Sequence, residues 1–152
     1  MAKMPDIAVE VTDLAKSYGF VVALKSVNFR IESGRYFVLL GPSGGGKTTL
    51  LRLIGGFIRP TRGRVLLHGR DVSDLPPNKR PTSMVFQSFA LFPHMSVAKN
   101  VGYGLRLRKL PVSEIFGRVD DMLEMVGLTG LGDRMPHELS GGQQQRVQLA
   151  RS

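Results

Sequence analysis

The chain has 152 residues, of which 42% are hydrophobic and 22% are charged, a composition typical of a globular domain with one sizeable core and not of a disordered segment. Its longest apolar run has the length of a strand, far below the roughly 18 residues of a membrane-spanning helix, and the start MAKMPDIAVEV predicts no signal peptide. The lack of cysteine excludes disulfides and thiolate metal sites and fits a reducing cytoplasm.

The charge balance raises the question of nucleic-acid binding, because 21 basic and 12 acidic residues give a formal charge of +9. The basic residues are scattered along the chain, without a long basic run and without interleaved aromatic residues. This distribution favours a solvated basic surface and no nucleic-acid partner. Weak attraction to anionic lipid head groups is the alternative.

The first part of the chain predicts mainly strands, at 7–11, 22–31 and 36–40. In VNFRI, at the end of the second predicted strand, apolar and polar residues alternate, which is typical of a half-buried strand. The apolar run YFVLL at 36–40 instead predicts a strand covered on both faces. A helix is expected from residue 47 to the glycine pair 55–56. A strand at 64–69, a proline-stiffened loop at 75–81 and a short buried strand at 83–86 follow.

From Ser96 onward the pattern is helical. Ser113 can cap a helix that closes at Gly127 and has its apolar residues on one side, namely Ile115, Phe116, Val119, Met122, Leu123 and Val126. We interpret Met122 and Met125 as core or subunit-contact residues. The order of elements predicts an α/β protein in which residues 1–95 form a β subdomain and the first part of the core, and residues 96–152 form a helical subdomain.

The segment GPSGGGKTT at 41–49 satisfies the phosphate-loop pattern G-x-x-x-x-G-K-[ST] between a predicted strand and a predicted helix. Glycines let backbone N–H groups wrap closely around a polyphosphate, and the helix adds its positive end. Lys47 would reach the β- and γ-phosphates, and the Thr48 hydroxyl would bind Mg²⁺. An ordinary glycine turn before a helix is the alternative. The other residues of the candidate loop are Gly41, Pro42, Ser43, Gly44, Gly45, Gly46 and Thr49.

The segment LSGGQQQR at 139–146 places Ser140 at the expected N-cap of another helix, where Gly141 and Gly142 leave N–H groups uncovered. Such a helix start is a second anion site on the same chain, in addition to the phosphate loop. One ATP has only one γ-phosphate for these two sites to share. The pattern therefore indicates a partner subunit. A capped surface helix without a ligand is the simpler interpretation.

LSGGQQQRV resembles the signature motif of ATP-binding cassette (ABC) ATPases, and GPSGGGKTTLLRLIGGF resembles their Walker A loop and helix. The resemblance extends over nearly the whole chain from about Ile7. It implies a P-loop NTPase (RecA-like) core with an N-terminal antiparallel β subdomain and an α-helical subdomain. It also implies a head-to-tail dimer, in which ATP and Mg²⁺ lie between the Walker A loop of one subunit and the signature residues of the other: Ser140, Gly141, Gly142 and Gln143.

Two further residues acquire a role only through this resemblance. Tyr18, in KSYG, matches the aromatic residue that stacks on adenine; otherwise it would be a half-buried strand tyrosine. Gln87, in VFQSF, matches the glutamine that contacts Mg²⁺ and the attacking water. The resemblance thus makes Lys47 and Gln87 the expected catalytic residues, and Thr48 and Gln87 the expected Mg²⁺ ligands.

Residues 55–81 and 85–106 are similar to ATPase subunits of bacterial importers, above all the spermidine/putrescine type and its iron(III), sugar and opine relatives. This implies a peripheral protein on the cytoplasmic face of the inner membrane, which contacts permease subunits through residues 87–110 and a periplasmic binding protein indirectly. His94 would lie near the permease and is not expected to bind a metal. Gly45 occupies a variable Walker A position, and Gln148 replaces a residue that is usually small or apolar.

The aspartate and glutamate of the family's Walker B strand and its switch histidine have no counterpart up to Ser152. We therefore expect a fold truncated before that strand, and a chain that binds ATP without turnover. Two alternatives are a non-transport ABC ATPase that acts on nucleic acid or ribosomes, and a nonfunctional fragment. The segment ALFPHMSV favours the importer, for which a polyamine-type substrate is expected.

Overall fold

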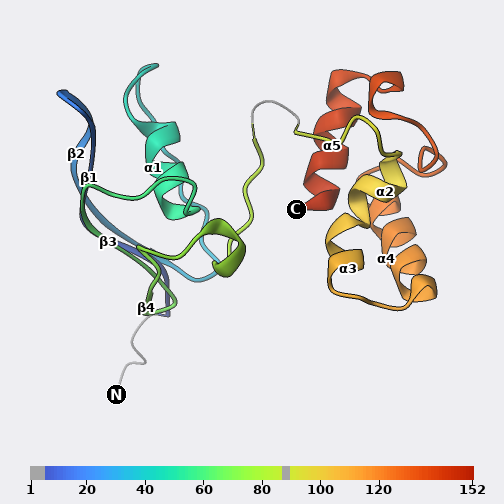
Figure 1. Cartoon of the computed structure of the whole chain (residues 1–152), viewed down its shortest axis with the longest axis horizontal. Coiled ribbons are helices and arrows are strands. Elements are labelled where there is room, and N and C mark those ends of the chain that lie inside the picture. Colours follow the sequence, from blue (N-terminus) through green and yellow to red (C-terminus); the bar gives the residue numbers. More distant parts are fainter. Residues whose placement is uncertain (1–5, 87–89) are drawn as a thin grey trace. The chain divides into compact units, whose positions relative to one another are not determined.

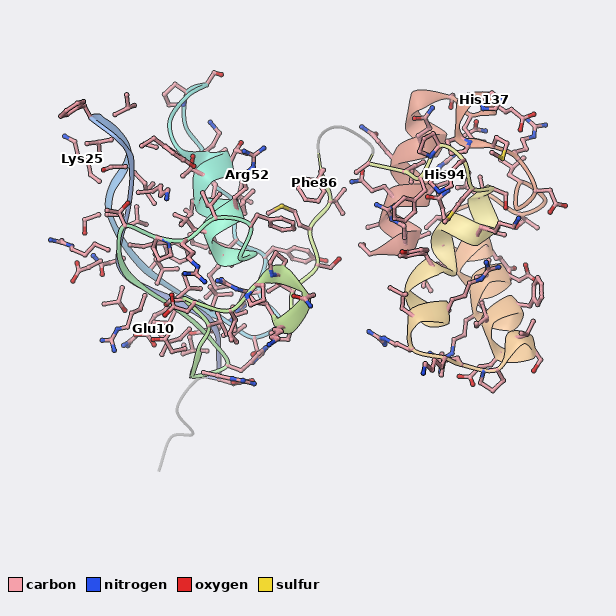
Figure 2. All side chains as sticks on the ribbon, in the orientation of Figure 1. Glu10, Lys25, Arg52, Phe86, His94 and His137 are labelled. Carbon is pink, nitrogen blue, oxygen red and sulfur yellow. The ribbon has the colours of Figure 1, made fainter. Side chains whose placement is uncertain are left out.

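The computed structural model describes residues 6–86 and 90–152. The chain divides into two compact units, Met1–Thr82 (unit 1) and Ser83–Ser152 (unit 2). Each unit has a hydrophobic core of its own, and the side chains in Figure 2 can be followed in each unit separately.

Unit 1 is built on a four-stranded antiparallel sheet in the order β2-β1-β3-β4 (Figure 1). Its strands are β1 (Ile7–Tyr18), β2 (Val21–Glu32), β3 (Arg62–Leu67) and β4 (Arg70–Asp71). The predicted strands at 7–11 and 22–31 are confirmed, and the strand predicted at 64–69 is present as β3, which ends at Leu67 because His68 and Gly69 form the turn into β4. β1 is longer than predicted because it continues past an irregularity at Asp13, whose N–H group donates a 2.8 Å hydrogen bond to the Asn28 side chain of β2.

Helix α1 (Lys47–Ile54) packs its apolar side against this sheet. Leu50 and Leu53 are buried in the same core as Leu14 of β1, Leu24 of β2 and Val65 of β3. The helix ends at Gly55, as the glycine pair predicts. The packing of this apolar face against the sheet therefore fixes the orientation of α1.

A buried arginine closes the other end of α1. The 3₁₀ turn η1 (Pro77–Lys79) leads into Arg80, whose guanidinium donates hydrogen bonds of 2.8 and 2.9 Å to the backbone oxygens of Leu53 and Ile54. These oxygens lack helical partners because they belong to the last turn, where the helix dipole is negative. Arg80 therefore caps the helix that begins at the glycine-rich loop.

Two predicted strands are absent from the described residues. Neither 36–40 nor 83–86 is a strand, and Tyr36 and Leu40 are 103% and 89% exposed. A strand covered on both faces needs neighbouring strands to pair with its backbone groups and further elements to cover its side chains. Among residues 6–86 and 90–152 no strand pairs with either segment, so the prediction of buried strands is wrong for both.

Unit 2 is helical. Its helices are α2 (Val97–Val101), α3 (Tyr103–Leu107), α4 (Val112–Met125) and α5 (Gly141–Arg151), with a 3₁₀ turn η2 (Pro136–Glu138) before α5. The buried Asn100 amide bonds to both the N–H group and the carbonyl oxygen of Phe92, which fixes the loop before α2. No helix in the described parts of the chain is long and apolar enough to cross a membrane.

The start of α4 differs from the prediction. The helix begins at Val112, and its N-cap is Pro111, so Ser113 lies within the first turn and does not cap it. The carbonyl oxygen of Pro111 accepts the first helical hydrogen bond, from the N–H group of Ile115. Proline suits a helix start because its φ is preset and its missing N–H group would have no helical partner there.

The apolar face of α4 is confirmed at three positions, which are buried: Ile115, Val119 and Leu123. Phe116 and Met125 are exposed, so Phe116 does not share the buried side of the helix, and Met125 is not a core residue, whereas its interpretation as a subunit-contact residue stays a prediction. Successive helical residues differ by about 100° in direction, and Phe116 follows Ile115 beyond the edge of the buried stripe.

Candidate nucleotide-binding site

The glycine-rich loop at 41–46 leads directly into α1. Gly44 and Gly46 have φ angles of 77° and 78°, a conformation that residues with side chains rarely adopt. A Cβ atom on Gly46 would also lie 2.7 Å from the backbone oxygen of Ala23 in β2. The loop therefore turns tightly against β2 and presents mainly backbone, which is what a phosphate cradle requires.

Lys47 folds back over this loop. Its ammonium group donates hydrogen bonds to the backbone oxygens of Gly41, at 2.7 Å, and of Pro42, at 2.6 Å. The N–H group of Gly45 also bonds to Pro42, at 3.1 Å, so the start of the loop is held to its end. Because both partners of the ammonium are neutral, an anion that replaces them would form the stronger, charge-assisted hydrogen bond.

The first turn of α1 adds to this positive character. It contains no acidic side chain, so nothing within that turn offsets the positive end of the helix dipole. Thr48 is exposed in this turn, and Thr49 is half-buried. A hydroxyl is an oxygen ligand of the kind that Mg²⁺ accepts, so Thr48 fits the cation that the motif implies. Gln87, the other expected ligand, lies outside the described residues.

Tyr18 lies at the end of β1, next to the turn into β2, and its side chain is 51% exposed. This turn and the glycine-rich loop lie at the same end of unit 1 (Figure 1), where Ala23 approaches Gly46. The Lys16 ammonium lies over the Tyr18 ring, 5.0 Å from its centroid. Sequence reasoning missed Lys16, although its spacing of two from Tyr18 places both side chains on one face of the strand.

The signature segment starts α5 as predicted. Ser140 is the N-cap, and its hydroxyl accepts a hydrogen bond from the N–H group of Gln143 at 3.3 Å. The Gln143 side chain accepts one in return from the N–H group of Ser140 at 2.9 Å, which completes a capping box. Gly141 and Gly142 are exposed, and because glycine has no side chain, neither residue covers the first N–H groups of α5.

The candidate site residues thus lie in two groups. Unit 1 holds the loop from Gly41 to Gly46 with Lys47, Thr48 and Thr49, and it also holds Tyr18 at the end of β1. Unit 2 holds Ser140 to Gln143. Among the described residues, no group of histidine, aspartate and glutamate side chains could hold a metal ion by itself.

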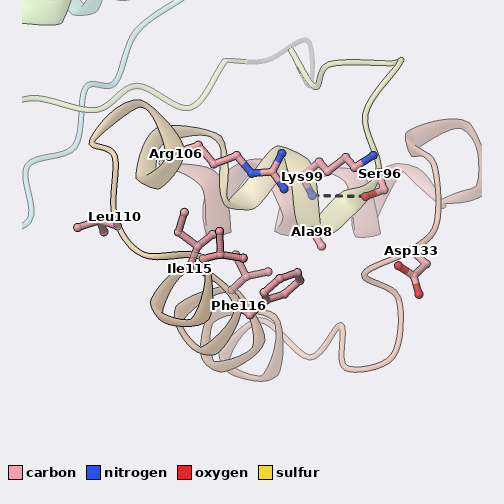
Figure 3. A pocket seen from close by; sticks show the side chains of 10 residues that line it. Ser96, Ala98, Lys99, Arg106, Leu110, Ile115, Phe116 and Asp133 are labelled. Atoms are coloured by element: carbon pink, nitrogen blue, oxygen red, sulfur yellow. Dashed lines mark hydrogen bonds between the residues drawn. The ribbon is translucent and has the colours of Figure 1, made fainter.

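Unit 2 also contains an apolar pocket next to α2 and α4 (Figure 3). Its volume is about 450 Å³, and Lys99 and Arg106 contribute two positive charges to its lining against the one carboxylate of Asp133. Its apolar lining residues include Ala98, Leu110, Ile115, Phe116 and Val119. The pocket thus contains part of the range 87–110 that the sequence assigns to a membrane partner.

This sequence is similar to proteins of a known family over nearly its whole length. The family model described as "ABC transporter" matches residues 24–152. The spermidine/putrescine import ATP-binding protein of Acidothermus cellulolyticus is 54% identical over 152 residues, which cover 97% of this chain and 39% of that protein. The sulfate/thiosulfate import ATP-binding protein of Mycolicibacterium paratuberculosis is 50% identical over 147 residues, which cover 97% of this chain and 41% of that protein.

Solved structures agree with this assignment. A dimeric bacterial ABC transporter cassette matches with a TM-score of 0.86 and 32% identity, over 94% of this chain and 68% of that one. A protein from Clostridium perfringens that is part of an ABC transporter complex matches with a TM-score of 0.84 and 33% identity, over 96% of this chain and 61% of that one. The α/β fold of a P-loop NTPase is therefore confirmed, and this chain belongs to the ABC transporter family.

Proposed function

We propose that this chain is the ATP-binding part of an ABC importer ATPase, and that the whole protein couples ATP hydrolysis to the import of a polyamine-type solute. The chain spans 39% of the length of the Acidothermus relative, so hydrolysis and import are proposed for the whole protein. One observation carries the proposal: the same chain holds a glycine loop closed by Lys47 and a second open helix start at Ser140.

The loop residues have distinct roles in this proposal. The phosphates of ATP take the place of the Gly41 and Pro42 carbonyls on the Lys47 ammonium, while the glycine backbone and the start of α1 bind the remaining oxygens. Thr48 holds Mg²⁺, with Gln87 as a second ligand that also orients water; when bound, Mg²⁺ neutralises phosphate charge. Tyr18 stacks on adenine; its half-exposed position at the end of β1 supports this role.

The signature residues act on the ATP of a second copy. Ser140 and Gln143 hold each other in the capping box, which presets the start of α5, and Gly141 and Gly142 leave its N–H groups accessible to an anion. A solved relative described as dimeric supports a pair of copies, for which we propose a head-to-tail arrangement. The N-terminus of α5 would then stabilise negative charge on the γ-phosphate of the partner's nucleotide.

The proposed membrane partner contacts residues 87–110, on the cytoplasmic face of the inner membrane. The pocket that contains Ala98, Lys99 and Arg106 supports this, because an apolar cavity with a positive lining suits an amphipathic segment that carries acidic residues. A periplasmic binding protein would act through that partner.

The proposed function is tested by replacing Lys47 and measuring ATP affinity by isothermal titration calorimetry with Mg²⁺. Lys47→Ala removes a charge-assisted contact to phosphate and should weaken binding by about 10- to 100-fold. Lys25→Ala is the matched control, because Lys25 is an exposed lysine in the same unit (Figure 2) and should leave the affinity unchanged. Equal ATP affinity in Lys47→Ala and the unmodified chain would contradict the proposal.

A further inference from the structure

The last residues of β1, which ends at Tyr18, are hydrogen-bonded to a segment other than β2. The residue that precedes β3, Thr61, also lies alongside β1. Its N–H group donates a hydrogen bond to the Ala15 oxygen at 2.9 Å, and its hydroxyl accepts one from the N–H group of Ser17 at 3.0 Å. The end of β1 that carries Tyr18 is therefore bonded to a second segment, whereas the ring itself remains half-exposed.

Lys16 connects that segment to the ring. Its ammonium donates a 2.8 Å hydrogen bond to the backbone oxygen of Arg59 and lies 5.0 Å from the centroid of the Tyr18 ring. The carbonyl anchors the cation, and the cation is attracted to the electron-rich face of the ring. The cation thereby covers one face of the Tyr18 ring and restricts its motion, while about half of the residue's surface stays exposed.

We propose that Lys16 is a positioning residue for the nucleobase, which acts through Tyr18 and not through the phosphates. This inference rests on the proposed function, because it requires adenine to stack on Tyr18. A ring fixed before binding loses less conformational entropy when the base stacks, so Lys16 increases only the part of the affinity that comes from the base. Inorganic triphosphate has no base, so its affinity does not depend on Lys16.

Calorimetry of the full chain with two ligands, ATP and inorganic triphosphate, tests this. Lys16→Met keeps the length of the side chain without its charge and should weaken ATP binding about two- to fivefold, as expected for an exposed cation–π contact. Triphosphate affinity should stay the same, which also shows that the variant is folded. Lys16→Arg keeps a cation that can stack on the ring and should restore ATP affinity, while Lys25→Met should change neither affinity.

A second background shows whether Lys16 acts through the ring. In Tyr18→Leu, the additional change Lys16→Met should have no further effect on ATP affinity. An unchanged ATP affinity in Lys16→Met, an equal loss for both ligands, or a full effect in the Tyr18→Leu background would overturn the inference. If Lys47→Ala weakens the binding of both ligands while Lys16→Met does not change ATP affinity, this inference fails alone. If Lys47→Ala has no effect, the proposed function fails and this inference fails with it.

Discussion

Gln148, in the middle of α5, is buried without a hydrogen-bond partner. Its side chain is 2% exposed, and within the described residues neither its amide oxygen nor its amide nitrogen is bonded. Removing an amide from water without a replacement hydrogen bond costs free energy, typically about 1–3 kcal/mol in proteins. The sequence already marks Gln148 as unusual for the signature helix, and the structure gives the physical reason why a small or apolar residue suits this position.

Gln148→Met should therefore stabilise unit 2. Methionine has nearly the same volume and fills the site without polar atoms, so the free energy of unfolding should rise by about 1–3 kcal/mol. Denaturant unfolding followed by circular dichroism measures the change. Gln145→Met, at an exposed position of the same helix, should shift stability by less than about 0.5 kcal/mol. A less stable Gln148→Met variant would show that the amide is paired in solution.

At the scale of helices and strands, the sequence predicts correctly those features that depend on residues adjacent in the chain. The capping pattern at Ser140 and the glycine pair after α1 specify helix ends through backbone geometry alone, and both ends lie where they were expected. The phosphate loop is likewise a local pattern. Lys47 occupies its position because the glycines before it allow the turn.

Elements that depend on distant partners were not predicted well. The run at 36–40 has the composition of a buried strand, but a strand also requires a pairing neighbour, which no pattern within those residues supplies. Arg80 shows the same limit, because nothing near it in the sequence indicates that its guanidinium reaches the end of α1. Site residues held by local geometry were thus predictable, whereas long-range contacts such as that of Lys16 with Arg59 were not.

Arg80 should be essential for the position of α1. Burial lowers the pKa of Arg80 and the carboxylates of Asp71 and Asp74 oppose this effect, but no carboxylate in the described residues forms an ion pair with it; its partners are backbone oxygens. Arg80→Met removes the donors that Arg80 supplies to Leu53, Ile54, Ser73 and Leu75, of which the Leu53 oxygen keeps a 3.2 Å hydrogen bond from the Gly56 N–H group. The substitution should destabilise unit 1 by about 2–4 kcal/mol. Hydrogen exchange should rise first at the C-terminal turn of α1.

Lys79→Met, at the adjacent exposed position, is the control for Arg80→Met and should leave both stability and exchange unchanged. If Arg80→Met is as stable as the unmodified chain, water or a neighbouring side chain satisfies the carbonyl oxygens, and Arg80 does not hold the helix.

At the scale of the whole molecule, the chain has two cores instead of one. The buried residues of unit 1 come from the sheet and α1, and those of unit 2 from α2, α4, α5 and the loops between them. The single core expected from the length of the chain is therefore not what the structure contains. Units of this size bury a small fraction of their surface and are individually marginal.

The two units should respond independently to mutations in their cores. Leu53→Ala removes a fully buried side chain from unit 1 and should lower its free energy of unfolding by about 2–5 kcal/mol. Val147→Ala does the same in unit 2, with a smaller loss because fewer atoms are removed. Hydrogen exchange resolved by residue should show each loss of protection only in the mutated unit, and the double variant should show the sum of the two. Loss of protection throughout the chain after either single substitution would show that the two cores unfold as one cooperative unit.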